Sequence, residues 1–250
     1  MAEGRMPSGH NRLLMTLPPE DYRQMSSQLE RVSLGLRDML YEPLQPIEFV
    51  YFPIDGVMSM LADMEEDSLV EVATVGNEGM VGLPLFLGAS VTPGQAFSQV
   101  PGEALRMTAD AFIDATVKCA SLPRLLHRYT QALMIQISQG TACNRVHEIE
   151  QRCARWLLLT HDRVGADEFS LTQEFLGQML GVRRATVNNI AVQFQEAGYI
   201  EYSRGRVRIR NRRKLEAVSC RCYSVIREEY DRMLGGLTPS NGRKAPRERR

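Results

Sequence analysis

The sequence "LTQEFLGQMLGVRRATVNNIAVQFQEAGYI", from Leu171 to Ile200, predicts two short helices that pack against each other. Gly181 stands between them, and glycine can adopt the positive φ that a sharp turn between helices requires. Gly177, one turn earlier, lacks a side chain that would hold the helices apart. Thr172 suits the start of the first helix, and the whole spacing is typical of a helix-turn-helix. The apolar residues that can face one another across the turn are Leu176, Leu180, Val182, Val187 and Ile190.

Polar side chains gather at the start of the second helix. Arginine can bind guanine through two hydrogen bonds and asparagine can bind adenine in the same way, so these residue types suit base reading in a major groove. Any one of them alone is more often a helix cap or a solvated side chain, but the group favours DNA. The residues that we expect to read bases are Arg183, Arg184, Thr186, Asn188 and Asn189.

The next segment, "YIEYSRGRVRIRNRRK", alternates apolar and charged residues around Ser-Arg-Gly-Arg, which predicts a β-hairpin. A hairpin directly after a helix-turn-helix forms a wing. Between Arg204 and Lys214, seven of eleven residues are basic. Contact with DNA phosphates explains such a run, because each neutralised phosphate releases counterions. The residues that we expect to contact phosphates are Thr172, Gln173, Arg204, Arg206 and Arg208.

The formal net charge is zero, but the charges are unevenly distributed. From Glu42 to Asp114 there are twelve acidic residues and one basic residue, whereas from Ser170 to Arg250 there are 17 basic and 8 acidic residues. This asymmetry indicates two domains with different partners. No apolar run is long enough to span a membrane, and the N-terminus lacks a signal-like apolar core, so we expect a cytoplasmic protein. Five cysteines, none before Cys119, do not indicate a disulfide framework.

Short β-prone runs separated by turn residues fill the segment from Leu36 to Met107, which predicts an antiparallel, jelly-roll-like β-roll. A helical pattern then extends from Leu122 to about Val164. One straight helix of that length would be roughly 60 Å long, so we expect an interruption near Gly140 or between Asn144 and His147.

A weak heptad repeat marks the first part of this helical pattern. The pattern alone leaves two interpretations open: the helix lies on the β-roll, or it forms a seam with the same helix of a second copy. The heptad and the neighbouring row consist of Leu126, Tyr129, Leu133, Gln136, Gly140 and Cys143.

The motif "LTQEFLGQMLGVRRATV", together with the order of β-roll, long helix and winged helix-turn-helix, resembles the Crp/Fnr family of bacterial transcription regulators over roughly Leu13 to Leu215. Members are homodimers that join through the long helix, bind inverted repeats in double-stranded DNA and contact RNA polymerase. The resemblance implies that the heptad residues form the dimer seam. It also places the family's base-reading positions at Arg184, Ala185 and Asn189. Many members carry Arg, Glu and Arg there, so a different half-site is expected.

The resemblance also bears on the effector. Members that bind cyclic AMP hold its phosphate with a Gly-Glu loop and an Arg-Ser pair. Here Glu78 lies between Gly76 and Gly79, but "QAFS" replaces the Arg-Ser pair, and no arginine lies between Arg37 and Arg106. Because anion sites usually need a cation, we expect no cyclic nucleotide. Oxygen-sensing members use clustered N-terminal cysteines, which this chain lacks, so we expect no iron–sulfur cluster and no other cofactor. The effector is unknown.

The cysteines offer a further possibility. Cys220 and Cys222 form a "SCRCY" pair near arginines, which could be a redox or metal site. Packing as small, half-buried side chains is favoured, and four zinc ligands with a recognisable spacing are not evident. For His147, solvation or capping is favoured. The sequence therefore predicts no metal site.

The sequence thus predicts an α+β chain with an N-terminal antiparallel β-roll, a long dimerisation helix and a C-terminal winged helix-turn-helix. We expect a homodimeric DNA-binding transcription regulator, whose signal is received by a degenerate cyclic-nucleotide-binding-like domain. An enzyme with a metal-binding, cupin-like roll is disfavoured, because no histidine lies between His10 and His127. A cysteine-based redox or metal-responsive regulator and a protein-interaction module without ligand sensing remain as alternatives. The expected domains are a disordered leader at 1–12, the sensor β-roll at 13–120, the dimerisation helix at 121–146, the winged helix-turn-helix at 147–216, and a C-terminal helix with a basic disordered tail at 217–250.

Overall fold

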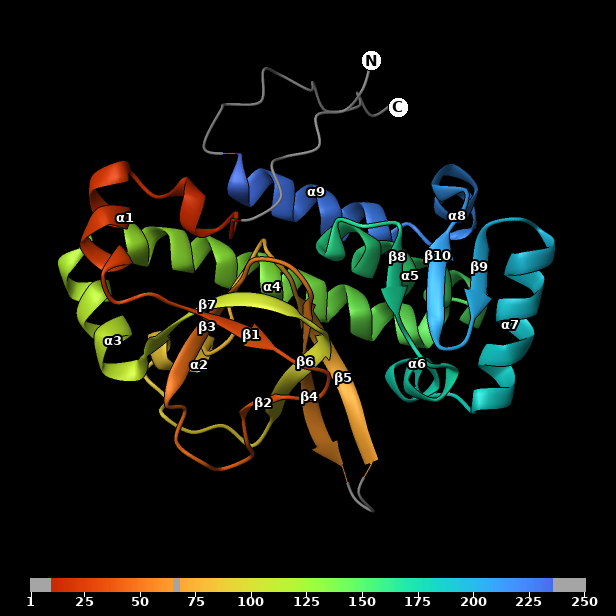
Figure 1. Cartoon of the computed structure of the whole chain (residues 1–250), viewed down its shortest axis with the longest axis horizontal. Helices are drawn as coiled ribbons and strands as arrows, with labels where there is room; N and C mark the ends of the chain where they lie inside the picture. The colour runs from red at the N-terminus through yellow and green to blue at the C-terminus, as the bar shows by residue number, and fades with distance from the viewer. Residues whose placement is uncertain (1–9, 65–67, 236–250) are drawn as a thin grey trace, which may run out of the picture.

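The computed structural model describes residues 10–64 and 68–235. A β-roll forms the N-terminal half, a small helical domain with its own sheet forms the C-terminal end, and a long helix runs along both (Figure 1). We call the C-terminal domain, residues 149–218, the head. The predicted α+β fold is thereby confirmed. None of the helices in the described ranges has the length and apolar character that crossing a membrane requires.

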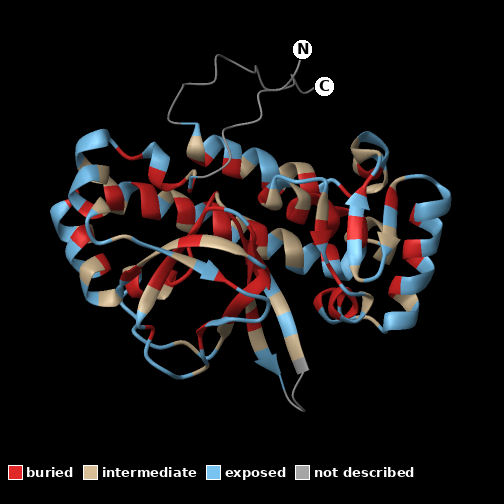
Figure 2. Cartoon of the chain, viewed as in Figure 1, coloured by how far each residue is buried: buried red, intermediate tan, exposed pale blue. Residues whose placement is uncertain are grey.

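The roll consists of two antiparallel sheets, one with the strand order β1-β7-β3 and the other with the order β2-β6-β4-β5. Aromatic and β-branched residues give these segments their strand preference. Their buried residues, red in Figure 2, form the core of the roll. The strands are β1 (Glu30–Leu34), β2 (Met39–Tyr41), β3 (Phe49–Pro53), β4 (Val57–Met64), β5 (Ser68–Val75), β6 (Gln95–Val100) and β7 (Gly102–Thr108).

Short helices flank the roll. The helix α3 begins where the Thr108 side chain accepts a hydrogen bond from the backbone N–H of Ala111 at 3.3 Å, as helix N-caps commonly do. The helix α1 has Pro19 at its first position, where the missing N–H costs nothing. These elements are η1 (Leu14–Thr16), α1 (Pro19–Ser26), α2 (Leu83–Phe86) and α3 (Ala109–Lys118).

The helical segment that follows is interrupted at His147 and Glu148, at the end of the expected range from Asn144 to His147 and not near Gly140. The helix α4 (Ser121–Val146) ends there because His147 adopts an extended backbone conformation. Glu148 and Gln151 then form a reciprocal capping box that starts α5 (Ile149–Val164). The break therefore separates the helix that covers the roll from the first helix of the head.

The helix α4 is fixed on one side by the roll and on another by α9 (Cys222–Leu234), which lies along it (Figure 1). The Tyr129 hydroxyl donates a hydrogen bond to the Met80 carbonyl at 2.8 Å. The Tyr230 ring on α9 packs 6.5 Å from the Tyr129 ring, and Arg128 donates to the Met233 carbonyl. Much of α4 is therefore covered within a single chain.

The head contains a helical hairpin and a small antiparallel sheet of order β8-β10-β9. In this sheet β10 lies between its partners, with Val207 opposite both Phe169 and Tyr202. The arrangement is a winged helix-turn-helix, as the sequence predicted. Its elements after α5 are β8 (Glu168–Ser170), α6 (Gln173–Leu180), α7 (Arg184–Glu196), β9 (Ile200–Ser203), β10 (Arg206–Ile209) and α8 (Arg212–Val218).

A buried polar network joins the head to the roll. Arg163, near the end of α5, donates hydrogen bonds to Glu78 at 2.7 Å, to Gln136 at 2.8 Å and to Thr74 at 2.5 Å. The side chains of Arg163 and Glu78 are only 4% and 7% exposed. Because an uncompensated buried charge is costly, these contacts fix the position of α5 against the roll and α4.

Candidate nucleic-acid interface

The hairpin of α6 and α7 has the local geometry that its glycines predicted. Gly181 ends α6 with a φ of +66°, a conformation that favours glycine. A Cβ atom on Gly177 would lie 2.9 Å from the Val182 carbonyl oxygen, so this glycine allows the turn to close against α6. The Thr172 hydroxyl caps α6 by accepting a hydrogen bond from the Phe175 N–H at 3.1 Å.

The helix α7 buries one face in the head and turns the opposite face to solvent (Figure 2). Its buried face consists of Val187, Ile190, Ala191 and Phe194. Thr186 is half-buried, and Gln173 at the start of α6 donates to the Asn188 side chain at 3.3 Å. The structure thus places the expected base-reading set on one accessible surface. The exposed members are Arg183, Arg184, Ala185, Asn188 and Asn189.

The wing is a tight hairpin. Arg204 and Gly205 both have positive φ, +50° and +73°, in the two-residue turn between β9 and β10. Val207 is buried in the head, whereas its neighbours Arg206 and Arg208 point to solvent. The wing is held beside the start of α6 by the Tyr202 hydroxyl, which donates to the Leu171 carbonyl at 2.8 Å.

An acidic residue on β8 pairs with the wing. Glu168 lies 3.0 Å from the Arg206 guanidinium and 2.5 Å from that of Arg208, through different carboxylate oxygens. The hydrogen bond from Arg208 is the main cause that lowers the pKa of Glu168. Two of the expected phosphate contacts therefore share one internal carboxylate. Glu168 could not be predicted from the sequence, because its pairing with Arg208 depends on the register of β8 and β10.

One of the expected base contacts, Arg184, and three of the expected phosphate contacts line one surface hollow. It lies between the starts of α6 and α7 and the turn of the wing. Among residues 10–64 and 68–235, no ion pair involves Arg184 or Arg204, so both guanidinium groups are available to an anion. Glu174 is the acidic residue at its edge. The lining residues are Thr172, Gln173, Glu174, Arg184, Tyr202, Arg204 and Gly205.

Comparison with known proteins agrees with this geometry. Residues 151–218 match the family model described as "Crp-like helix-turn-helix domain". The fold over most of the chain is that of FixK2 from Bradyrhizobium japonicum, with a TM-score of 0.65, 17% identity, and coverage of 77% of this chain and 98% of that one. Residues 151–218 therefore form a Crp-like helix-turn-helix domain, and the chain as a whole has the fold of solved Crp/Fnr-type regulators.

Two further solved structures share this Crp/Fnr fold. A CRP-family transcriptional regulator from Thermus thermophilus has a TM-score of 0.62 and 15% identity, covering 76% of this chain and 96% of its own. The c-di-GMP responsive global regulator CLP of Xanthomonas campestris has a TM-score of 0.61 and 14% identity, covering 78% and 100%. At such identities the structures establish the fold only. No curated protein matches this chain in sequence.

The heptad residues lie on α4 but not on its free face, where a dimer seam would need them. Gly140 is half-buried, and the others are covered by the chain's own roll and C-terminal helix: Leu126, Tyr129, Leu133, Gln136 and Cys143. Side chains buried within one chain cannot form the surface of a seam with another. A different row of α4, spaced by three and four residues, is exposed: Arg124, His127, Gln131, Met134, Ser138, Thr141 and Arg145.

Side chains from α4 and α5 fill the space around the loop of the roll that carries Glu78. The Glu78 carboxylate pairs with Arg163. The space beside Gly76 holds the Arg163 side chain, and that beside Gly79 holds the Tyr129 ring. The two glycines therefore permit close packing of α4 and α5 on the roll.

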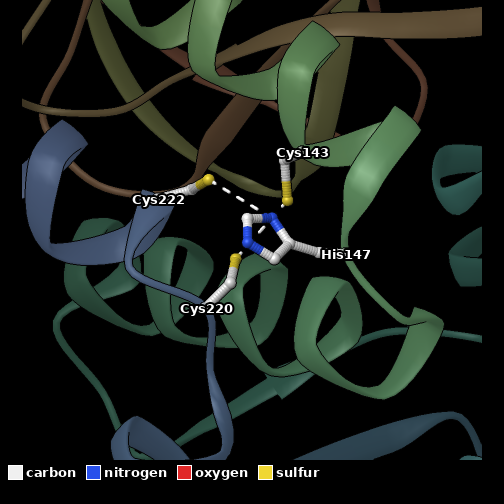
Figure 3. Close-up of side chains that lie close together, drawn as sticks. All are labelled: Cys143, His147, Cys220 and Cys222. Atoms are coloured by element: carbon white, nitrogen blue, oxygen red, sulfur yellow. Dashed lines mark hydrogen bonds between the residues drawn. The ribbon is translucent and has the colours of Figure 1, made fainter.

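Four side chains that can bind a metal come together, at positions where the sequence favoured packing or capping over a redox or metal site. The sulfur atoms of Cys143 and Cys220 are 3.4 Å apart, and the Cys222 sulfur lies 3.6 Å from Nδ1 of His147 (Figure 3). All four ligand atoms lie within 4.8 Å of one another. The sequence carried a signal in the spacings Cys-x3-His and Cys-x-Cys, but only the fold shows that the two pairs meet.

Proposed function

We propose that the chain is a homodimeric, DNA-binding regulator of transcription and not an enzyme. The observation that carries this proposal is the hollow at the starts of α6 and α7, where Arg184 and Arg204 have no acidic partner among the described residues. It lies beside the exposed polar face of α7. Such a surface suits a helix in the major groove with the wing on the backbone.

The two kinds of contact have separate roles. Arg184 and Asn189, on the exposed face of α7, would contact base edges, with Arg183, Ala185, Thr186 and Asn188 around them. Arg204 and the Thr172 end of α6 would hold a phosphate in the hollow, helped by the positive end of the α6 dipole. Arg206 and Arg208 would contact phosphates while they remain near Glu168.

The exposed row of α4 is the seam that we propose for the homodimer. Met134, which is 58% exposed, is its apolar centre, with His127, Gln131 and Ser138 on the same row. Pairing two copies of this helix would present two α7 helices to successive major-groove faces, roughly 34 Å apart on an inverted repeat.

Sedimentation equilibrium tests this seam. Met134→Glu should convert a dimer into a monomer, because it would place two like charges in an apolar contact. Ile113→Glu is the matched control, since Ile113 on α3 is 47% exposed and lies outside the row. A dimer that withstands Met134→Glu would exclude this seam.

The roll would receive the signal and pass it to the head through α4 and α5. The proposal includes contact with RNA polymerase and a cytoplasmic location. The regulator CLP is described as responsive to c-di-GMP. Here the Glu78 loop already holds Arg163, which supports an effector other than a cyclic nucleotide bound at that loop.

Selection of bound sites from a randomised duplex pool tests the function. Purified protein without added ligand should enrich an inverted repeat whose half-sites lie about one helical turn apart. Salt-sensitive binding without enrichment would indicate that the effector is needed for specificity. Absence of salt-sensitive DNA binding would overturn the proposal and favour a protein-interaction module.

A further inference from the structure

We propose that Cys143, His147, Cys220 and Cys222 bind a single zinc ion, which fixes the head and the C-terminal helix to the long helix. The four residues come from two junctions of the chain. Cys143 and His147 lie at the end of α4, and Cys220 and Cys222 lie where α8 leads into α9 (Figure 3).

The separations between the ligand atoms suit one ion. Tetrahedral zinc lies about 2.3 Å from sulfur and 2.0–2.1 Å from nitrogen, so its ligand atoms are about 3.5–3.8 Å apart. Two of the separations here are 3.4 Å and 3.6 Å, and none exceeds 4.8 Å. A four-iron cluster gives each cysteine its own iron, which holds the sulfur atoms farther apart, so a mononuclear centre is favoured.

The ligand types also favour zinc. Three thiolates and an imidazole form a soft set that selects zinc over magnesium or calcium. Four protein ligands leave no open coordination position, which is typical of structural sites. The three cysteines form a buried cluster of their own, separate from the main hydrophobic core. Their hydrogen-bond contacts within the cluster involve thiols, which are weak donors and acceptors, so packing alone does not explain why these groups meet.

Arg155 is a buried cation next to the cysteines, where it could balance the negative charge of a loaded zinc site. Three thiolates, a neutral imidazole and Zn²⁺ carry a net charge of −1. Arg155 on α5 is 9% exposed, and its Nε atom has no hydrogen-bond partner among the described residues. Its guanidinium interacts electrostatically with all three cysteines. Arg155 would therefore compensate the charge of the loaded site.

The position of the site suggests what the ion does. It would join residues 77 positions apart, Cys143 and Cys220, across the break between α4 and α5. That break separates the long helix from the head. Zinc would hold the two at a fixed angle and anchor the start of α9, and any consequence for DNA affinity rests on the function proposed above.

Cobalt is the probe for the first test, because tetrahedral Co²⁺ bound to thiolates absorbs visible light. Reduced, metal-free full-length protein should bind one Co²⁺ per chain, with tetrahedral d–d bands and thiolate charge transfer. Zn²⁺ should abolish these bands. No cobalt spectrum from the reduced wild-type protein would overturn the proposal, as would binding of several irons with sulfide and no zinc.

Variants identify the ligands. Cys222→Ala should weaken Co²⁺ binding by at least about tenfold, since losing even a hydrogen-bond partner of a ligand costs that much. His147→Ala should keep the charge-transfer bands and alter the d–d bands. Cys119→Ala and Cys153→Ala remove buried cysteines outside the cluster and are the matched controls. Equal affinity in Cys222→Ala and the controls would overturn the assignment.

A measurement on the unaltered protein keeps the test independent of folding and DNA binding. In wild-type protein, Zn²⁺ should slow alkylation of Cys143, Cys220 and Cys222, as followed by mass spectrometry, and leave Cys119 and Cys153 unchanged. Equal alkylation with and without zinc would overturn the proposal. So would a Cys143–Cys220 disulfide in protein prepared with zinc and without air, because it would identify a redox pair.

Discussion

Arg184 is the residue on which base reading should depend most, since it begins the exposed face of α7 and lines the hollow beside the wing. Arg184→Ala should weaken binding to the selected site by about 1–3 kcal/mol and leave random DNA less affected. Arg206→Ala should weaken binding to every sequence and flatten the salt dependence. Filter binding over a salt series would measure both. Equal losses on selected and random DNA for Arg184→Ala would exclude base reading by this residue.

Removing the charge of Glu168 should strengthen DNA binding, whereas removing Arg184 or Arg206 should weaken it. Its carboxylate pairs with Arg206 and Arg208, which would otherwise face phosphates without a competitor. Glu168→Gln should therefore raise affinity for all DNA and steepen the dependence of affinity on salt. Glu174→Gln, at the edge of the hollow, is a comparison that leaves both wing pairs intact. Unchanged affinity in Glu168→Gln would mean that the two arginines do not contact the backbone.

Glu71 should give folding stability a pH dependence. Its carboxylate accepts hydrogen bonds from Ser59 at 2.6 Å and Trp156 at 2.8 Å. Burial raises the pKa of Glu71 from 4.5 to about 7 in spite of these hydrogen bonds. The folded chain therefore keeps the Glu71 proton to a higher pH than the unfolded chain. The stability that this protonated carboxyl contributes is lost as the pH rises from 4.5 to about 7.

Urea unfolding at several pH values would measure this contribution. Glu71→Gln should be more stable than the wild type at pH 8, by on the order of 1–3 kcal/mol. At pH 4 the difference should be much smaller, since Glu71 is then protonated in both states. A difference that does not vary with pH would contradict the raised pKa.

At the scale of elements, two glycines offer a matched comparison. Gly181 has a φ of +66° in the turn between α6 and α7, and Gly140 lies inside α4 with nothing within 4 Å of an added Cβ. Gly181→Ala should destabilise the head by about 1–2 kcal/mol, because alanine is strained in the left-handed region. Gly140→Ala should stabilise the chain by roughly 0.5–1 kcal/mol. Denaturant midpoints would give both values, and equal effects would contradict the turn geometry.

The elements also show what the sequence could and could not predict. The helical hairpin, the wing and the break after α4 depend on local signals: a glycine at a turn, an alternating strand pattern and the capping box at Glu148. The face that α4 buries depends on where the roll and α9 pack. Both faces of α4 carry residues at heptad spacing. The sequence pattern therefore could not decide whether the face with Leu126 or the face with Met134 is the exposed one.

The same limit applies to the contacts between distant segments. Arg163 meets Glu78, and Cys143 meets Cys220, across 85 and 77 residues respectively. No pattern within a window of sequence relates such positions. The residue types could be recognised as a buried cation or as metal ligands, but their pairing is a property of the folded chain.

At the scale of the whole molecule, Arg163 should matter more for stability than any exposed arginine. Arg163→Met would leave Glu78 buried without a cation, which should cost about 3–5 kcal/mol. Arg124→Met, on the exposed row of α4, should change stability by less than about 0.5 kcal/mol. Calorimetry of the two variants would test this difference. Similar melting temperatures would mean that the network contributes little.

The network around Arg163 has a consequence for hydrogen exchange. Its partners come from β5, from the loop after β5 and from α4, while Arg163 itself belongs to the head. If the head separated from the roll, Arg163 and Glu78 would both be exposed without their partner. Slowly exchanging amides in β5 and in α5 should therefore share one opening free energy and become labelled together. The roll and the head, although they are separate domains, would then exchange as one unit.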